Sequence, residues 1–264
     1  MSQKMLYDWR QPVTPRSLAL WFLSTAAPAP LRTATLIGRA AIFAIEPAAM
    51  RVALGRLVRE RMAVQPERGV YALGPAAAAL HVRARGWTRA EERVRAWDGA
   101  WVVVLTHHLG RTDRSRLTVR ERALRLAGLA AAGPGVWVRP DNLTVAVREE
   151  ARGLGLEEQA IVMTACRAAP EQDAAFRALW PAAALETAYR YWLTEMAAST
   201  ERLTNATAID AARETYLLGQ SVLRAINSDP MLPEELVDAA LRARMVAAMK
   251  RYNAMALGWW DQVR

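Results

Sequence analysis

The stretch EPAAMRVALGRLVRER, residues 46–61, determines how the first third of the chain is interpreted. Pro47 predicts the start of a helix, because proline lacks an N–H that the first helical turn would not use. Apolar residues then recur at i, i+4, i+7 and i+8, which places one apolar stripe along a helix from Pro47 to Arg61. The stripe consists of Met50, Leu54, Leu57 and Val58.

Arginines occupy much of the rest of this predicted helix. At about 100° per residue, Arg51 and Arg59 lie about 80° apart, so both can face one groove. Arg56 projects about 140° from Arg51 and can instead hold a phosphate or an internal acid. Arginine forks bind guanine edges in the major groove or the phosphates beside it. The alternative is a solvated helix face with no ligand.

The flanking sequence predicts a small DNA-binding module. One helix begins with Ser17 as its N-cap, and a second runs from about Thr33 to Ala44. Two short strands, 62–64 and 70–73, follow the arginine-rich helix and are joined by a turn. Three helices followed by a hairpin is the order of a winged helix-turn-helix, over residues 17–75. On this prediction Arg39 of the second helix can reach the DNA backbone, and Arg68 of the turn a phosphate or the minor groove.

Length and composition limit the protein class. The chain has 264 residues, 53% hydrophobic and 23% charged, which predicts a folded protein of two or three domains. Its one cysteine, Cys166, excludes a disulfide framework and a multi-cysteine metal site. No apolar run is long enough to span a bilayer and no signal peptide is recognisable, so we expect a cytoplasmic protein without membrane contact.

The positive charge is concentrated at one end of the chain. The net charge is +9, and residues 1–99 hold 15 basic against 7 acidic residues, whereas residues 100–264 hold 20 against 19. A terminal nucleic-acid-binding module on a nearly neutral body has this distribution. Double-stranded DNA is therefore the expected partner.

The remaining sequence predicts an α+β protein with further domains. After an N-terminal arm (1–16) and the winged helix, we expect a helical linker over 76–96 that carries several arginines. Residues 97–170 alternate strands (101–106, 136–139, 160–167) with helices (117–132, 143–153), which is typical of a ferredoxin-like α/β domain. Residues 171–264 predict a helical C-terminal domain, with helices over about 173–198, 205–227 and 233–259.

Four stretches of this sequence, in this order, resemble the PaaX family of transcriptional repressors of phenylacetic acid degradation operons. They are RVALGRLVRE (51–60), WDGAW (97–101), PGVWVRP (134–140) and DPMLPEEL (229–236). The resemblance covers roughly residues 17–260. Departures lie around the wing, where Arg61-Met62 and Leu73-Gly74-Pro75 stand in place of the family's usual residues.

The resemblance implies a function as well as a fold. It implies a DNA-binding winged helix, a central ferredoxin-like domain similar to a CRISPR integration-complex subunit, and a helical C-terminal domain. It further implies a homodimer on a palindromic operator of a catabolic operon, released by an aromatic or acyl-CoA effector. No cofactor is implied, and the effector-binding residues remain unknown at this point.

Several conspicuous residues have two interpretations each. Trp97, Trp101 and Trp137 can stack on an aromatic effector, but large aromatics at strand starts are usually core. Arg139 can bind a phosphate of an acyl-CoA or form a structural salt bridge. The linker arginines can extend a phosphate track or cover a solvated helix; they are Arg83, Arg85, Arg89, Arg93 and Arg95.

Enzymatic function is the alternative to regulation. The central domain could be a metal-dependent nuclease or another enzyme, with the winged helix serving only to bring it to DNA. The pair His107-His108 lacks further nearby metal ligands in the sequence, and no Gly-x-Ser-x-Gly motif or carboxylate cluster is present. We therefore expect no enzyme and no metal site. A third interpretation is a protein-interaction module, in which reversing the charges of Arg51 and Arg59 leaves activity unchanged.

Overall fold

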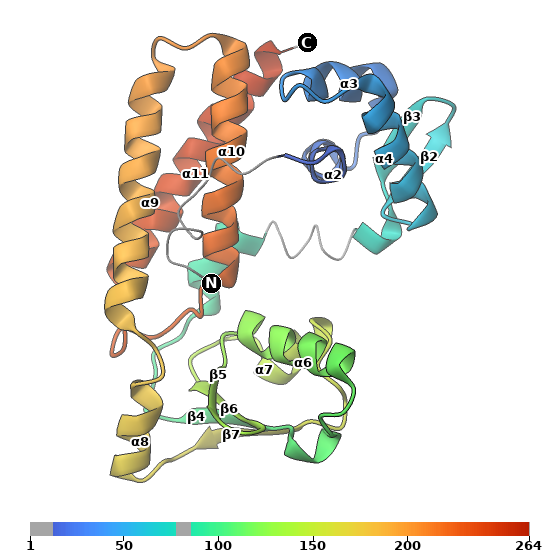
Figure 1. Ribbon diagram of the computed structural model, residues 1–264. Coiled ribbons are helices and arrows are strands. Elements are labelled where there is room, and N and C mark those ends of the chain that lie inside the picture. The colour runs from blue at the N-terminus through green and yellow to red at the C-terminus, as the bar shows by residue number, and fades with distance from the viewer. Residues whose placement is uncertain (1–12, 78–85, 264) are drawn as a thin grey trace. The chain divides into compact units, whose positions relative to one another are not determined.

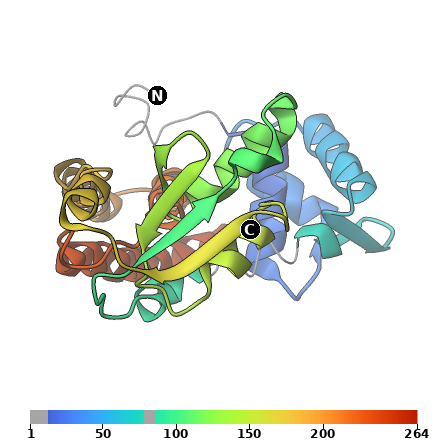
Figure 2. The same cartoon turned by 90° about the horizontal axis from the view of Figure 1, so that it is seen from below.

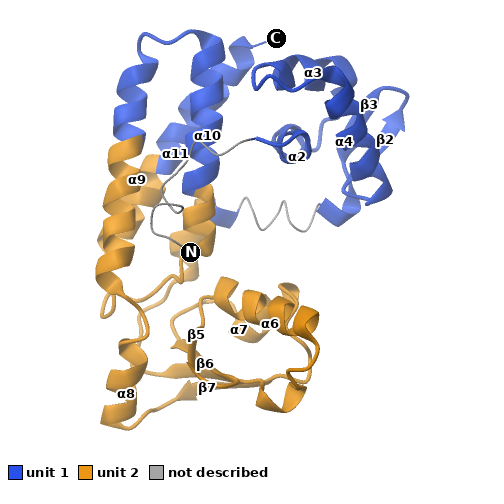
Figure 3. Cartoon of the chain, in the orientation of Figure 1, with its two compact units in different colours: residues 1–87, 196–222, 249–264 blue, residues 88–195, 223–248 orange. Residues whose placement is uncertain are grey.

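The computed structural model describes residues 13–77 and 86–263 (Figure 1). Most of the expected N-terminal arm, and the linker residues Arg83 and Arg85, lie outside these ranges. The chain forms two compact units, each assembled from separate segments (Figure 3). Unit 1 contains residues 1–87, 196–222 and 249–264, and unit 2 contains residues 88–195 and 223–248. The long C-terminal helices are therefore divided between the units.

The first part of unit 1 combines three helices with a small antiparallel sheet. The helices are α2 (Pro15–Ala26), α3 (Thr33–Ala41) and α4 (Pro47–Arg59). The strands are β1 (Leu31–Arg32), β2 (Ala63–Glu67) and β3 (Val70–Leu73). The sheet order β1-β3-β2 places the last strand of the hairpin in the centre.

Local sequence explains where these helices begin and end. α2 begins with Thr14 as its N-cap, and Ser17 is the third helical residue, whose side chain completes the capping box. The expectation that Ser17 is the cap was therefore wrong by three positions. α4 begins at Pro47 as expected. It ends at Arg59, two residues earlier than expected, and Arg61 then turns the chain with a φ of 60°.

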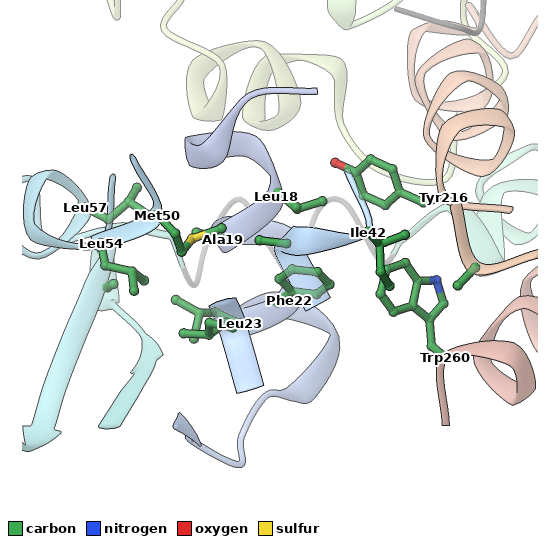
Figure 4. Close-up of a cluster of buried hydrophobic side chains, with 14 residues drawn as sticks. Leu18, Ala19, Phe22, Leu23, Ile42, Met50, Leu54, Leu57, Tyr216 and Trp260 are labelled. Atoms are coloured by element: carbon green, nitrogen blue, oxygen red, sulfur yellow. The ribbon is translucent and has the colours of Figure 1, made fainter. Parts of the chain in front are cut away.

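The core of unit 1 joins residues far apart in the sequence (Figure 4). Leu18, Phe22 and Leu23 of α2 pack with Met50, Leu54 and Leu57 of α4. The same cluster includes Tyr216 and Trp260, which come from the C-terminal helices. The first helices thus complete their core with residues about 200 positions away.

Unit 2 contains a four-stranded antiparallel sheet of βαββαβ connectivity. Its elements are β4 (Trp101–Leu105), α6 (Arg114–Leu126), β5 (Ala130–Gly133), β6 (Val136–Pro140), α7 (Val147–Gly153) and β7 (Ile161–Cys166). The order β5-β6-β4-β7 is the ferredoxin-like arrangement. Helices α6 and α7 cover one face of this sheet (Figures 1 and 2). A short 3₁₀ segment, η1 (Gly86–Arg93), precedes the sheet, and another, η2 (His107–Leu109), follows β4.

Strand β5 was missing from the sequence-based expectation, which continued the preceding helix to Ala132. The helix ends at Leu126, and Gly128 follows with a φ of +79°. A Cβ at Gly128 would lie 2.6 Å from Nη1 of Arg139, so only glycine fits this turn. The alanines after it pair with β6, as Ala130 does with Val138.

Four helices make up the C-terminal part of the chain. They are α8 (Pro170–Arg177), α9 (Ala182–Leu203), α10 (Ala208–Ser228) and α11 (Ala239–Gln262). The single helix expected over 173–198 is divided, and α9 begins immediately after Pro181. Among the described residues, no helix is both long and apolar enough to cross a membrane.

Candidate nucleic-acid interface

Helix α4 buries one side and presents the other to solvent. Met50, Leu54 and Leu57 are completely buried, as the apolar stripe predicted. The three arginines of the sequence-based site, Arg51, Arg56 and Arg59, are all exposed. One helix therefore places these guanidinium groups on a single solvent-facing surface.

Small residues lie between these arginines on the exposed face of α4. At about 100° per residue, Arg51 and Arg56 mark the two edges of an arc of about 140°. Ala48, Gly55 and Val52 project within that arc, together with Arg59. Val52 is 54% exposed, so its apolar side chain faces solvent on the same side of the helix as the arginines. The helical spacing in the sequence already places Val52 on this face, opposite the apolar stripe.

The C-terminal end of α4 is held in place by neighbouring groups. Glu60, which caps the helix, forms an ion pair with Arg16 at the start of α2. Nε of Arg59 donates to the carbonyl oxygen of Gly55 at 3.4 Å. These contacts orient the last turn, but they leave the guanidinium of Arg59 exposed to solvent.

The tip of the β2–β3 hairpin carries Arg68, which is exposed. Gly69 beside it has a φ of +78°, and its carbonyl oxygen accepts hydrogen bonds from the amide (2.8 Å) and the hydroxyl (2.9 Å) of Thr33. Thr33 is the first residue of α3. The hairpin tip is thus anchored to the helix preceding α4, and Arg68 projects from an anchored turn.

Arg39 differs from the other four predicted site residues. Its side chain is half-buried, with the guanidinium carbon 5.8 Å from the ring centroid of Phe22 in the core. Its Nε is buried and has no hydrogen-bond partner among the described residues. Arg39 thus packs partly against the core of unit 1 and is less available to a ligand than the arginines of α4.

Two arginines of the expected linker form ion pairs with acidic residues of unit 2. Arg93 binds Glu150 at 2.6 Å, and Arg95 binds Asp141 at 2.9 Å. These contacts support the structural interpretation of the two residues over a phosphate track.

The aromatic candidates of unit 2 divide into two groups. Trp97 and Trp101 are buried and meet edge-on, and Trp101 also contacts Phe176 and Trp180. These two tryptophans are core residues. Trp137 is also largely buried but lines a pocket, with the guanidinium of Arg125 5.5 Å from its ring centroid.

His107 and His108 follow β4 and meet edge-on, and Nε2 of His108 lies 2.9 Å from the carbonyl oxygen of Gln159. In the part of the chain that the structure describes, no three His, Cys, Asp or Glu side chains are grouped to hold a metal ion. Cys166 is partly exposed at the end of β7.

Arg139 has a structural role, but it forms no salt bridge with the described residues. Its buried guanidinium donates to four oxygens of neutral groups: the carbonyls of Pro140, Ala127 and Pro230, and Oδ1 of Asn142. Burial disfavours the charged form and lowers the pKa of Arg139 to about 10. Arg139 therefore connects β6 and the end of α6 to the segment between α10 and α11.

Two comparisons with known proteins agree with this architecture. A family model described as the PaaX protein central Cas2-like domain matches residues 94–176. These residues contain the whole sheet of unit 2 and the helices α6 and α7. No curated protein matches the chain significantly.

One matching solved structure is the uncharacterized protein Rv0674 from Mycobacterium tuberculosis. It is 27% identical in sequence, and the match covers 95% of this chain and 98% of that chain with a TM-score of 0.68. The similarity therefore extends through both units. The central domain of this chain is thus similar to the central domain of PaaX proteins, and the similarity to the mycobacterial protein extends over nearly the whole chain.

Proposed function

We propose that this protein is a transcriptional regulator that binds double-stranded DNA through a winged helix-turn-helix in residues 17–75. The exposed face of α4, with arginines at both edges of a strip of small side chains, is the observation that carries the proposal. The similarity of residues 94–176 to the central domain of PaaX proteins supports a regulatory role in aromatic catabolism over an enzymatic one.

The shape of this face suits the major groove. Ala48 and Gly55 are small enough to let the helix approach the base edges, while Arg51 and Arg56 at the edges can reach the two phosphate walls. Arg59 lies nearer the centre of the arc and is the candidate for a bidentate contact to guanine. Arg68 on the anchored hairpin would contact the adjacent backbone.

Val52 adds an apolar contact to this assignment. An exposed valine among arginines has no role in the core, but the C5 methyl of thymine is the apolar group of the major groove. We assign Val52 to a thymine methyl. Replacing single thymines of the bound site with uracil removes only that methyl and should weaken binding several-fold at one position. The same replacement of thymine by uracil should not change the DNA affinity of the Val52→Ala variant.

Repression, dimerisation and release by an effector complete the proposal. A homodimer would present two α4 helices to half-sites about one helical turn apart, roughly 34 Å, or a multiple of it. An aromatic or acyl-CoA effector would act by binding the DNA-free form more tightly than the DNA-bound form. A small-molecule effector is the expected ligand, and no cofactor is required.

The decisive experiment is a DNA-binding titration on the promoter upstream of this protein's own gene, repeated over a series of salt concentrations. The wild type should bind saturably and sequence-selectively, and log Kd should depend steeply on log salt. Arg51→Ala/Arg59→Ala should lose selective binding, with a salt slope shallower by about 1–2. The control is Lys250→Ala/Arg251→Ala, which removes the same charge from exposed positions of α11.

Either of two results would overturn the proposal. One is equal, weak binding of the wild type to any DNA. The other is an equal loss of affinity in both double variants, which would mean that net charge alone governs binding.

A further inference from the structure

Unit 2 contains a pocket of about 350 Å³ whose position is set by three elements. Its walls are one side of α6 from Leu117 to Arg125, the segment that follows β4, and the β5–β6 hairpin. The volume falls at the lower end of the range for small-molecule sites. The pocket lies wholly within unit 2, separate from the α4 face.

The walls of this pocket are fixed by backbone contacts. The amide of Thr106 donates to the carbonyl oxygen of Gly135 at 2.8 Å, which binds the hairpin to the segment after β4. A Cβ on Gly135 would lie 2.7 Å from the backbone of His107, so glycine is required for this close approach. Arg120 donates to the carbonyl oxygens of Gly110 and Leu109, which binds the same segment to α6. The pocket is therefore preformed.

The pocket lining combines apolar and cationic side chains. Trp137, Leu117 and Pro134 provide the apolar surface. Three arginines line the pocket, but two have acidic partners. Arg120 is paired with Glu157 at 2.7 Å and Arg125 with Glu121 at 2.7 Å.

Arg111 is the third arginine of the lining, and it has no ion-pair partner among the described residues. The lining thus carries one uncompensated positive charge together with the Trp137 ring and the Arg125 guanidinium that lies over it. A ligand that matches this surface has a planar apolar body and a single negative charge.

We propose that this pocket binds a small aromatic carboxylate, with its ring against Trp137 and its carboxylate on Arg111. A whole coenzyme A thioester is far too large for the pocket and carries several phosphates where the lining offers one free cation. The assignment of this pocket as the effector site rests on the proposed function. Its assignment as a binding site for an aromatic carboxylate does not.

The test is calorimetric titration of the full-length protein with 2-naphthoate, without DNA. We expect a Kd of about 0.1 mM, which is ordinary for a ligand of this size. The neutral isostere 2-naphthamide should bind at least tenfold more weakly, and inorganic phosphate and coenzyme A should not compete with 2-naphthoate.

Two variants locate the site. Arg111→Gln should weaken 2-naphthoate binding at least tenfold, whereas Arg114→Gln, an exposed arginine at the start of α6 outside the pocket lining, should not change it. Gly133→Leu should abolish binding without unfolding the protein, because a Cβ at Gly133 meets no atom within 4 Å. Circular dichroism melting curves verify the fold of each variant.

Three results would overturn the pocket assignment: no binding of 2-naphthoate to the wild type, equal binding of acid and amide, or unchanged binding in Arg111→Gln and Gly133→Leu. None of them affects the DNA-binding proposal, since the titration contains no DNA. Conversely, a protein that binds 2-naphthoate but no DNA would retain the pocket and lose the proposed function.

Discussion

The C-terminal helices contribute to both units, but the contacts they make in each are chemically opposite. In unit 1 they supply aromatic side chains: Tyr216 of α10 and Trp260 of α11 both contact Phe43, at ring-centroid distances of 5.0 and 6.2 Å. In unit 2 the segment around α10 and α11 supplies backbone carbonyls and buried polar side chains. The C-terminal segments thus complete the core of unit 1 mainly with aromatic rings, whereas in unit 2 buried hydrogen bonds accompany buried apolar residues such as Leu232 and Met245.

In unit 1 the C-terminal helices contact the N-terminal helices through a cluster of aromatic rings with few polar groups, which we call the aromatic joint. Trp21 meets Tyr216 and Trp260 at 4.8 and 5.0 Å, and Phe22 meets Trp260 at 5.4 Å. Nε and Nη2 of Arg213 in α10 both donate to the carbonyl oxygen of Ile42, just after α3. Such a joint derives its stability from buried area and tolerates small changes in geometry.

In unit 2 the segment between α10 and α11 contacts the rest of the unit through buried hydrogen bonds, which we call the polar joint. The strength of these hydrogen bonds depends on their geometry. Asn142 donates to the carbonyl oxygen of Met231 at 2.8 Å, and the hydroxyl of Tyr189 donates to Asp229 at 2.6 Å. Burial raises the pKa of Asp229, and the hydrogen bond from Tyr189 partly opposes that rise. Arg242, also buried, donates to the carbonyl oxygen of Leu232. Because buried polar groups are costly without partners, removing one member should cost more here than in the aromatic joint.

The largest effect should come from Arg139→Met. Methionine fills a similar volume but leaves the acceptors on Ala127, Pro230 and Asn142 without their donor, so we expect a loss of about 4 kcal/mol in the free energy of unfolding. Urea unfolding followed by circular dichroism measures it. The control is Arg122→Met on the exposed side of α6, with an expected change under about 0.5 kcal/mol. A loss below about 1 kcal/mol for Arg139→Met would remove the distinction between the joints.

Trp260→Ala should break the aromatic joint at a cost of about 3 kcal/mol, because it leaves a cavity among Trp21, Phe22 and Phe43. Trp260→Phe sharpens the comparison. The indole N–H of Trp260 is buried without a partner among the described residues, so its removal offsets part of the lost packing. We expect Trp260→Phe to lie within about 1 kcal/mol of the wild type. Equal losses of unfolding free energy in Trp260→Ala and Trp260→Phe would contradict the conclusion that apolar burial stabilises the aromatic joint.

A smaller effect concerns the pH dependence of stability that an ion pair of unit 2 provides. The side chain of Arg120 donates hydrogen bonds to Glu157 and lowers the pKa of that carboxyl below its usual 4.5. A lowered pKa means stability that is present above the unfolded value and lost as the pH falls through the folded one. Glu157→Gln should therefore cost about 2 kcal/mol at pH 7 and progressively less below pH 4.5.

Urea unfolding of Glu157→Gln at several pH values tests this dependence. The neighbouring Glu158→Gln is the control, because Glu158 is exposed. A stability difference between Glu157→Gln and the wild type that does not change with pH would exclude the ion pair as its source.

The sequence predicted the elements with strong periodicity and missed those that tertiary contacts decide. The stripe on α4 and the branched run of β4 were sufficient for a helix and a strand. β5 was missed because four small residues carry no strand signal, and their pairing with β6 decides their conformation. The division between α8 and α9 was missed because both sides have helical composition.

The site could be predicted only in part for the same reason. Arg51, Arg56 and Arg59 follow from helical spacing alone, and the structure exposes all three. The half-buried position of Arg39 depends on Phe22, which is 17 positions earlier in the chain. The pocket of unit 2 combines a helix, a hairpin and a turn, and no single stretch of sequence contains its pattern.

The ring cluster around Trp260 also limits how this protein can be divided or inherited. A fragment that ends at residue 77 contains every strand and helix of the N-terminal module but lacks the residues that cover Trp21, Phe22 and Phe43. Recombination that exchanged this module between relatives would have to exchange matching positions in α10 and α11 as well. The N-terminal module is therefore expected to change in evolution together with the C-terminus, as one unit of inheritance.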